Sequence, residues 1–215
     1  MPDTQPALPG ITIHRAPATD PAPGLAPAPG HIDLEAKVVL REGKWLELLA
    51  CTPGSKEHES ILTVTARPSH IHLALLILGM EPGSPMKWDW QGDEFKITPP
   101  TGPKIAITLH YTDAQGKAVD VAAHHWIRNQ KLDQPLTDNH WLFTGSRTEI
   151  VGDQSIYRAD VNGSAISLVN FSDDLLARPT HLTHQNDDAT WAAQTDAIPP
   201  LGTSVNIRLT PVKNP

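Results

Sequence analysis

The 215-residue chain has a single cysteine, few aromatic residues apart from its six tryptophans, and no long apolar run. One cysteine excludes a disulfide within the chain. The longest apolar stretch, residues 71–78, is far shorter than the roughly 20 residues that span a bilayer, so we expect no transmembrane segment. The formal net charge is −7, and the lysines and arginines are not clustered. Because nucleic-acid binding needs concentrated positive charge, we expect no nucleic-acid partner.

Proline is concentrated at the amino-terminal end. Residues 1–30 hold eight of the 21 prolines, with one arginine and no lysine. This composition predicts a flexible, solvated tether ahead of a single globular domain at residues 31–213. A basic start followed by an apolar core, the pattern of a signal peptide, is not visible. Since such a tether suits the stretch just after a signal or lipid anchor, we expect an exported protein of the periplasm or cell envelope.

The apolar patterns after residue 30 favour strands over helices. Alternating or β-branched runs flanked by turn residues predict strands at 32–40, 45–50, 60–66, 104–112, 117–123, 141–144, 156–160, 165–170 and 204–210. The first two are expected to form a hairpin that ends at Cys51. Pro68 and Gly79 bracket a short buried helix at about 68–78, and further short helices are expected from Ser172 and over 186–194. The sequence therefore predicts a strand-dominated α+β domain with a mostly antiparallel sheet.

Chemically versatile side chains are concentrated in the ten residues CTPGSKEHES at 51–60. A Pro-Gly turn brings a thiol, an amine, an imidazole and two carboxylates together without help from distant sequence. These groups are used for metal ligation and for nucleophilic or acid–base chemistry. The candidate catalytic residues are therefore Cys51, His58 and Glu59, while Lys56 and Ser60 are candidates for holding a ligand.

The same residues also have a structural interpretation. Cysteine is among the most buried residue types, so Cys51 is as readily explained as a small apolar residue that ends a strand. A histidine between two glutamates is ordinary on a solvated surface. A Lys–Glu ion pair and a Ser60 hydroxyl can equally pin a turn to the sheet.

Other segments, together with the loop at 51–60, carry a resemblance to a known family. They are LGMEPGSP at 78–85, HHWIRN at 124–129, HWLFTGS at 140–146, YRAD at 157–160, SLVNFSDDLLARP at 167–179 and IPPLGTSVNIRLTP at 198–211. In this order they resemble the YdjY-type domain, over roughly residues 32–212. The resemblance implies an exported bacterial protein, typical of planctomycete-like bacteria, and implies no particular activity. A cysteine-ligated iron–sulfur cluster within one chain is excluded, because it needs several cysteines.

A metal site is the next hypothesis. Cys51 and His58, joined by His72 from the apolar helix, would suit zinc or copper. A blue-copper site is disfavoured, because its ligand loop includes a methionine and lies near the carboxyl terminus. An isolated buried histidine such as His72 is also readily explained as a hydrogen-bonded part of the core.

A second candidate surface follows the predicted strand at 117–123. His125, Trp126 and Arg128 offer an aromatic face and a cation for an anionic or carbohydrate partner, but a tryptophan packed under an arginine uses the same residues. A serine hydrolase is disfavoured because the G-x-S-x-G nucleophile elbow is missing. A Cys51–His58 dyad is the better enzyme hypothesis.

The sequence thus favours a non-catalytic exported domain that binds a small ligand, an envelope component or a metal ion beside the loop at 51–60. The first alternative is a cysteine- or metal-dependent enzyme that uses Cys51, His58 and Glu59. The second is a purely structural domain of an envelope assembly.

Overall fold

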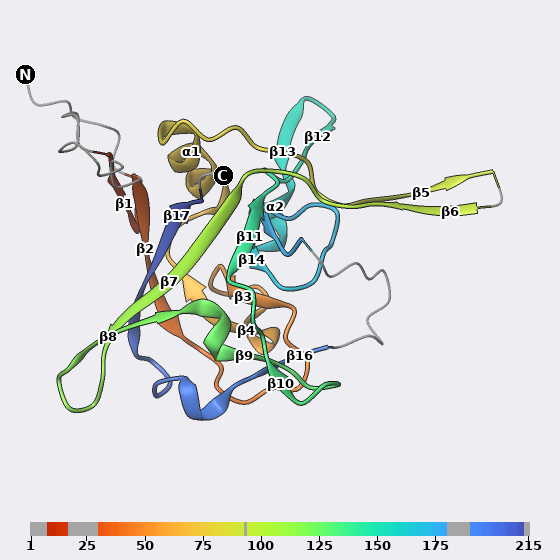
Figure 1. The fold of residues 1–215 in the computed structure, drawn as a ribbon. Coiled ribbons are helices and arrows are strands. Elements are labelled where there is room, and N and C mark those ends of the chain that lie inside the picture. Colours follow the sequence, from red (N-terminus) through yellow and green to blue (C-terminus); the bar gives the residue numbers. More distant parts are fainter. Residues whose placement is uncertain (1–7, 17–29, 93, 180–189, 213–215) are drawn as a thin grey trace, which may run out of the picture.

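Eight strands close into a barrel in the computed structural model, which describes residues 8–16, 30–92, 94–179 and 190–212 (Figure 1). In the order in which they pair, they are β2 (His31–Val38), β17 (Ser204–Pro211), β7 (Lys104–Thr112), β11 (His140–Phe143), β15 (Leu176–Ala177), β14 (Ser164–Ser167), β3 (Leu48–Cys51) and β4 (Ser60–Val64). The pairing of β4 with β2 closes the ring. Only β14–β15 and β3–β4 are parallel among these pairs. The strand-dominated fold is confirmed, but the predicted sheet is closed into a barrel, which the sequence did not predict.

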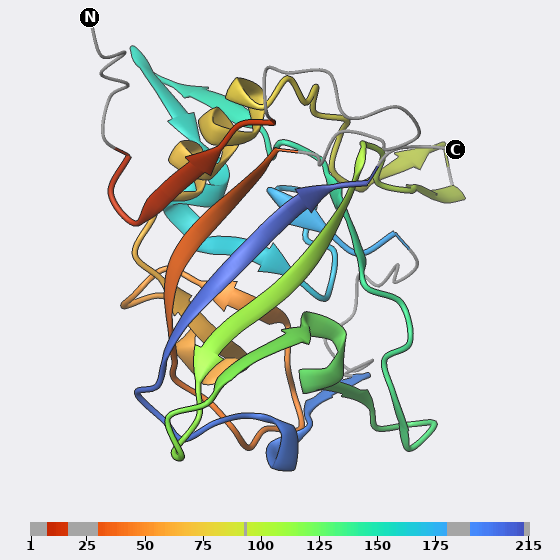
Figure 2. The same cartoon turned by 60° about the vertical axis from the view of Figure 1, so that its left-hand side comes forward.

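Two further strands lie beside the barrel. The first half of β2 pairs with β1 (Ile11–His14) and its second half with β4, so β1 extends the sheet. On the other side, β8 (Ala118–Ala122) pairs with β7. Figure 2 shows β1, β2, β17 and β7 side by side. Strand β1 falls inside the segment predicted to be a flexible tether, so that prediction is wrong for Ile11–His14. Residues 1–7 and 17–29 of the tether lie outside the described residues.

Alternation along the strands builds the core. On β2, Ile32 and Leu34 are completely buried inside the barrel, together with Ile207 and Leu209 of β17 and Ile107 of β7. Each such side chain contributes about 1.5–3 kcal/mol through its removal from water. Because side chains alternate, the residues between them point outward from the barrel.

The remaining strands form small sheets. The hairpin of β5 (Lys87–Gln91) and β6 (Glu94–Thr98) projects away from the barrel (Figure 1). A second hairpin pairs β12 (Thr148–Val151) with β13 (Gln154–Tyr157). A three-stranded sheet joins β10 (Gln134–Pro135), β9 (Ile127–Asn129) and β16 (Trp191–Ala193).

Single 3-10 turns occur at Glu57–Glu59, Ala123–Trp126 and Thr195–Ala197.

Helix α1 (Pro68–Ile77) confirms the predicted helix at about 68–78. Pro68 stands in its first turn, where a missing N–H costs nothing. Gly79, at φ +81°, ends the helix; the Met80 N–H donates to the Leu75 carbonyl and the Gly79 N–H to that of Leu76, which is a Schellman motif. Contrary to the expectation of an entirely buried helix, Leu73 and Leu76 are exposed. The helix packs against β1 and α2 (Arg158–Asn162).

Four local predictions are wrong. The strand predicted at 156–160 ends at Tyr157, and helix α2 follows it. Strands β2 and β3 do not form a hairpin with each other, because β3 pairs with β14 and β4 instead. Ser172 does not begin a helix; it has φ +67°, and the Asp174 carboxylate accepts the Phe171 N–H at 2.8 Å. Trp191–Ala193, predicted as helix, is strand β16, and residues 186–189 lie outside the described part.

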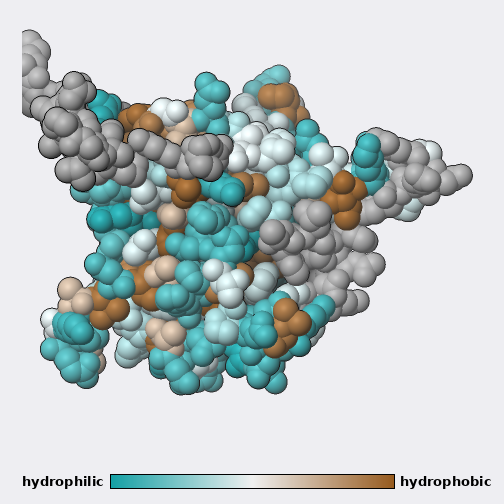
Figure 3. Space-filling model, in the orientation of Figure 1, coloured by the Kyte–Doolittle hydropathy of each residue, from teal (hydrophilic) through white to brown (hydrophobic). Residues whose placement is uncertain are grey.

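The described helices are all too short or too polar to cross a membrane. In the space-filling view the surface is a mixture of hydrophilic and hydrophobic areas, and no single apolar area dominates this face (Figure 3).

Candidate functional site

The outward face of β2, β17 and β7 is polar. Three residues in cross-strand register, Glu35, Asn206 and His110, form one row across the three strands. The next row toward the start of β2 contains Asp33 and Arg208. Since neighbouring side chains on one face of a sheet lie within contact distance, these rows form a continuous polar surface on the barrel wall.

A groove of about 770 Å³ runs over this surface. Its polar lining includes Glu35, Lys37, Thr63, Thr112, Ser204 and Asn206. The groove therefore offers one carboxylate, one amine, several hydroxyls and an amide, which together can hydrogen-bond a small polar molecule. Pro53 also lines it, so the groove lies next to the beginning of the Cys51–Ser60 loop.

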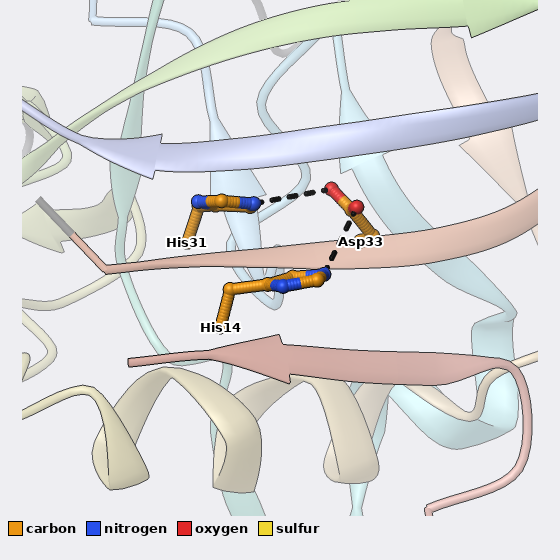
Figure 4. Close-up of side chains that lie close together, drawn as sticks. All are labelled: His14, His31 and Asp33. Carbon is orange, nitrogen blue, oxygen red and sulfur yellow. Dashed lines mark ion pairs between the residues drawn. The ribbon is translucent and has the colours of Figure 1, made fainter. Parts of the chain in front are cut away.

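A cluster of titratable side chains adjoins the groove. His14 of β1 and His31 of β2 are cross-strand partners, and their rings stack with centroids 4.4 Å apart. Both rings direct a nitrogen toward Asp33 (Figure 4). His14 Nε2 lies 3.2 Å from Asp33 Oδ2, and His31 Nε2 lies 4.0 Å from Oδ1. Arg208 of β17 donates to both oxygens of Asp33, at 2.8 and 2.9 Å.

This environment fixes the charge of Asp33. Burial acts to raise the pKa of its carboxyl, but hydrogen bonds from Arg208 and Asn206 and the charge of Arg208 outweigh burial and lower the pKa. Asp33 is therefore an anion at neutral pH. Burial, and then the charge of Arg208, lower the pKa of His31, which is therefore neutral there.

Cys51, predicted as a ligand or nucleophile, is completely buried at the end of β3. Burial raises the pKa of its thiol, and the hydroxyls of Ser60 and Ser55 oppose this only in part. Because the thiolate is the reactive form, this environment suits a packed side chain rather than a nucleophile.

Lys56 lies between the carboxylates of Glu47 and Glu59. Its ammonium nitrogen is 3.5 Å from Glu47 Oε2 and 3.5 Å from Glu59 Oε1, and it stands 4.1 Å from the centre of the Phe171 ring. Burial, and then the charge of Glu59, raise the pKa of Glu47. This arrangement pins the loop to the barrel.

The two further candidate residues of the loop, His58 and Ser60, lie in different environments. His58 has a side chain that is 79% exposed, with Nε2 3.8 Å from Glu59 Oε2. Ser60 is buried, and its hydroxyl donates to the Leu62 carbonyl at 2.9 Å. With Cys51 buried and His58 in solvent, the geometry gives no support to a dyad of these two residues.

His72 of α1 has partners elsewhere. The Tyr157 hydroxyl donates to the Gly145 carbonyl at 3.0 Å, so His72 Nδ1, 2.8 Å from the same hydroxyl oxygen, is the donor to it. The ring also packs edge-on against Phe143. Among the described residues, Cys51, His58 and His72 do not form a cluster of ligand atoms, whereas His14, His31 and Asp33 do.

The segment with His125, Trp126 and Arg128 is not a continuous binding surface. The chain leaves β8 for a 3-10 turn, which places Trp126 in the core against Tyr111. His125 is exposed beside His124, and Arg128 forms an ion pair with Asp133.

Sequence reasoning missed the cluster on β1 and β2. One signal was available, because His31 and Asp33 have the His-x-Asp spacing that puts two side chains on one face of a strand. His14 carried no such signal, since only the pairing of β1 with β2 places it opposite His31.

The fold and the site together define a closed β-barrel domain with a polar groove on its outer wall. The family model named YdjY domain matches residues 28–210, and the chain belongs to that family. No curated protein and no solved structure matches the chain.

Proposed function

We propose that this domain is a non-catalytic binding module of the cell envelope that holds a small polar ligand in the groove beside the Cys51–Ser60 loop. The observation that carries the proposal is the groove itself, with its hydrogen-bonding side chains on a rigid barrel wall. Strand-borne side chains hold their positions better than loop residues, which favours a preformed site.

The lining indicates the chemistry of the ligand. Lys37 suits a carboxylate, Glu35 an amine, and the hydroxyls of Thr63 and Ser204 suit sugar or amide groups. A soluble peptidoglycan fragment, with an acetamido sugar and a short peptide, combines these features. The proline-rich composition of residues 1–30 is that of an extended spacer, which would suit a domain tethered in the envelope.

The test is to titrate such a fragment into ¹⁵N-labelled protein and follow the amide chemical shifts. We expect saturable shifts at Glu35, Lys37 and Asn206. Ser204→Trp fills the groove and should abolish them, while the control Ser155→Trp, on the exposed face of β13, should not. Shifts elsewhere on the surface, or none for peptidoglycan fragments, free sugars and amino acids at millimolar concentration, would contradict the proposal.

A further inference from the structure

Ion pairing with Asp33 explains only part of the histidine pair: His14 Nε2 lies 3.2 Å from Asp33 Oδ2, whereas His31 Nε2 lies 4.0 Å from Oδ1. Arg208 already neutralises the carboxylate through two hydrogen bonds. His31 Nε2 is shielded from solvent and has no hydrogen-bond partner among the described residues. Two imidazoles therefore point at a carboxylate that is already paired with a guanidinium, and one of them has a buried nitrogen without a partner among the described residues.

We propose that His14, His31 and Asp33 bind a divalent transition-metal ion, zinc or copper, through two imidazole nitrogens and one carboxylate oxygen. This donor set is one that zinc and copper commonly take in proteins. The site is distinct from the groove and does not depend on a ligand there.

The distances fit such a site. With metal–ligand distances of about 2.0–2.1 Å, the ligand atoms of a tetrahedral ion lie about 3.3 Å apart. His14 Nε2 and Asp33 Oδ2 are 3.2 Å apart, and the three ligand atoms all lie within 4.8 Å of one another. In the structure the two rings stack with only 18° between their planes, so both rings must rotate out of the stack for their nitrogen lone pairs to meet at one ion.

The backbone places the ligands without strain. His31 and Asp33 are two residues apart on β2 and share one face, and His14 stands directly opposite His31 on β1 (Figure 4). Arg208 spans both oxygens of Asp33 and so fixes the orientation of the carboxylate, as partners of metal ligands usually do. Two hydrogen bonds from Arg208 and one from Asn206 take three of the four carboxylate lone pairs, which leaves one lone pair for the ion.

Three protein ligands leave further coordination positions open. The His14 side chain is 44% exposed, so these positions are accessible to water or to an exchangeable ligand. The ion would also join β1 to the barrel, because His14 comes from β1 while the other two ligands come from β2.

The test uses the full chain, freed of metal with a chelator and titrated with zinc by calorimetry. We expect one equivalent to bind. His14→Gln and His31→Gln should each weaken affinity at least about tenfold, because even the loss of a partner that only orients a ligand typically costs about 10–100-fold. His58→Gln removes an exposed histidine outside the cluster and should bind zinc like the unsubstituted protein. No uptake, or equal uptake in all variants, would overturn the proposal.

A measurement on the unsubstituted protein guards against variants that do not fold. Imidazole nitrogen shifts, recorded by long-range ¹H–¹⁵N correlation, should change at Nε2 of His14 and His31 on addition of zinc. Shifts confined to other histidines would place the metal elsewhere and contradict the proposed site.

Discussion

The Cys51–Ser60 loop and the outer face of β1, β2 and β17 differ in how their polar groups are used. In the loop, Lys56 is shared by Glu47 and Glu59, Ser60 donates to a backbone carbonyl, and Cys51 is buried. On the outer face, His31 Nε2 has no hydrogen-bond partner among the described residues, and the groove is open to solvent. The polar groups of the loop are taken up by neighbouring groups, whereas on the outer face Asp33 and Arg208 are paired with each other, and His31 and the groove side chains remain available.

The largest expected effect concerns the reactivity of Cys51. Because its thiol is buried and its pKa is raised, alkylation by iodoacetamide near pH 7.5 should be at least about 100-fold slower in the native protein than in urea-unfolded protein. Mass spectrometry of timed samples measures the rate. Equal rates in the two states would show that Cys51 is accessible in the native protein. The loop would then offer a reactive group, as the outer face offers available polar groups.

Lys56→Met should cost about 2 kcal/mol of unfolding free energy at pH 7.5, because two partly buried carboxylates then face each other without a cation. Urea denaturation measures it. Lys37→Met, which removes a lysine from the open groove, should change stability by less than about 0.5 kcal/mol.

The pH dependence of this cost has a definite sign. The pKa of Glu47 is already raised in the folded protein, mainly by burial, so ionisation of Glu47 opposes folding. The cost of Lys56→Met is therefore full above the folded-state pKa of Glu47 and shrinks as pH falls through it. A cost that is unchanged between pH 7.5 and 4.5 would contradict this account, and Glu47→Gln should recover part of the loss at pH 7.5.

Asp33→Asn should cost about 1 kcal/mol, because Arg208 loses a charged partner but keeps about a third of its side chain in solvent. Thermal unfolding without added metal measures the change. Glu35→Gln, two residues along the same face of β2, should be near neutral. A loss for Asp33→Asn as large as that for Lys56→Met would show that the outer face is as tightly packed as the loop.

The sequence predicted correctly those strands and helices whose formation depends on residues close together in the chain. Alternating apolar residues predicted β7 and β17 within one residue of their bounds, and Pro68 with Gly79 predicted α1. The closure of β4 onto β2 was not predictable in the same way, because it joins segments whose pairing is decided by the whole barrel.

The same limit applies to the candidate sites. The Cys51–Ser60 loop was conspicuous because its residues are neighbours in sequence, but burial, which decides the state of Cys51, depends on the distant strand β14. At Ser172 the local pattern favoured a helix N-terminus, yet Asp174 turned inward and is completely buried. His14 lay in a proline-rich segment and had no signal at all.

The smallest expected effect is that of His58→Ala. The imidazole is 79% exposed and lies 3.8 Å from Glu59 Oε2, so its loss should change the unfolding free energy by less than about 0.5 kcal/mol. Urea denaturation at pH 7.5 checks this, with Lys56→Met as the sensitive neighbour in the same loop. A cost of more than about 1 kcal/mol would mean that His58 helps to hold the loop. A near-neutral result would mean that Lys56 stabilises the loop whereas the exposed imidazole of His58 does not.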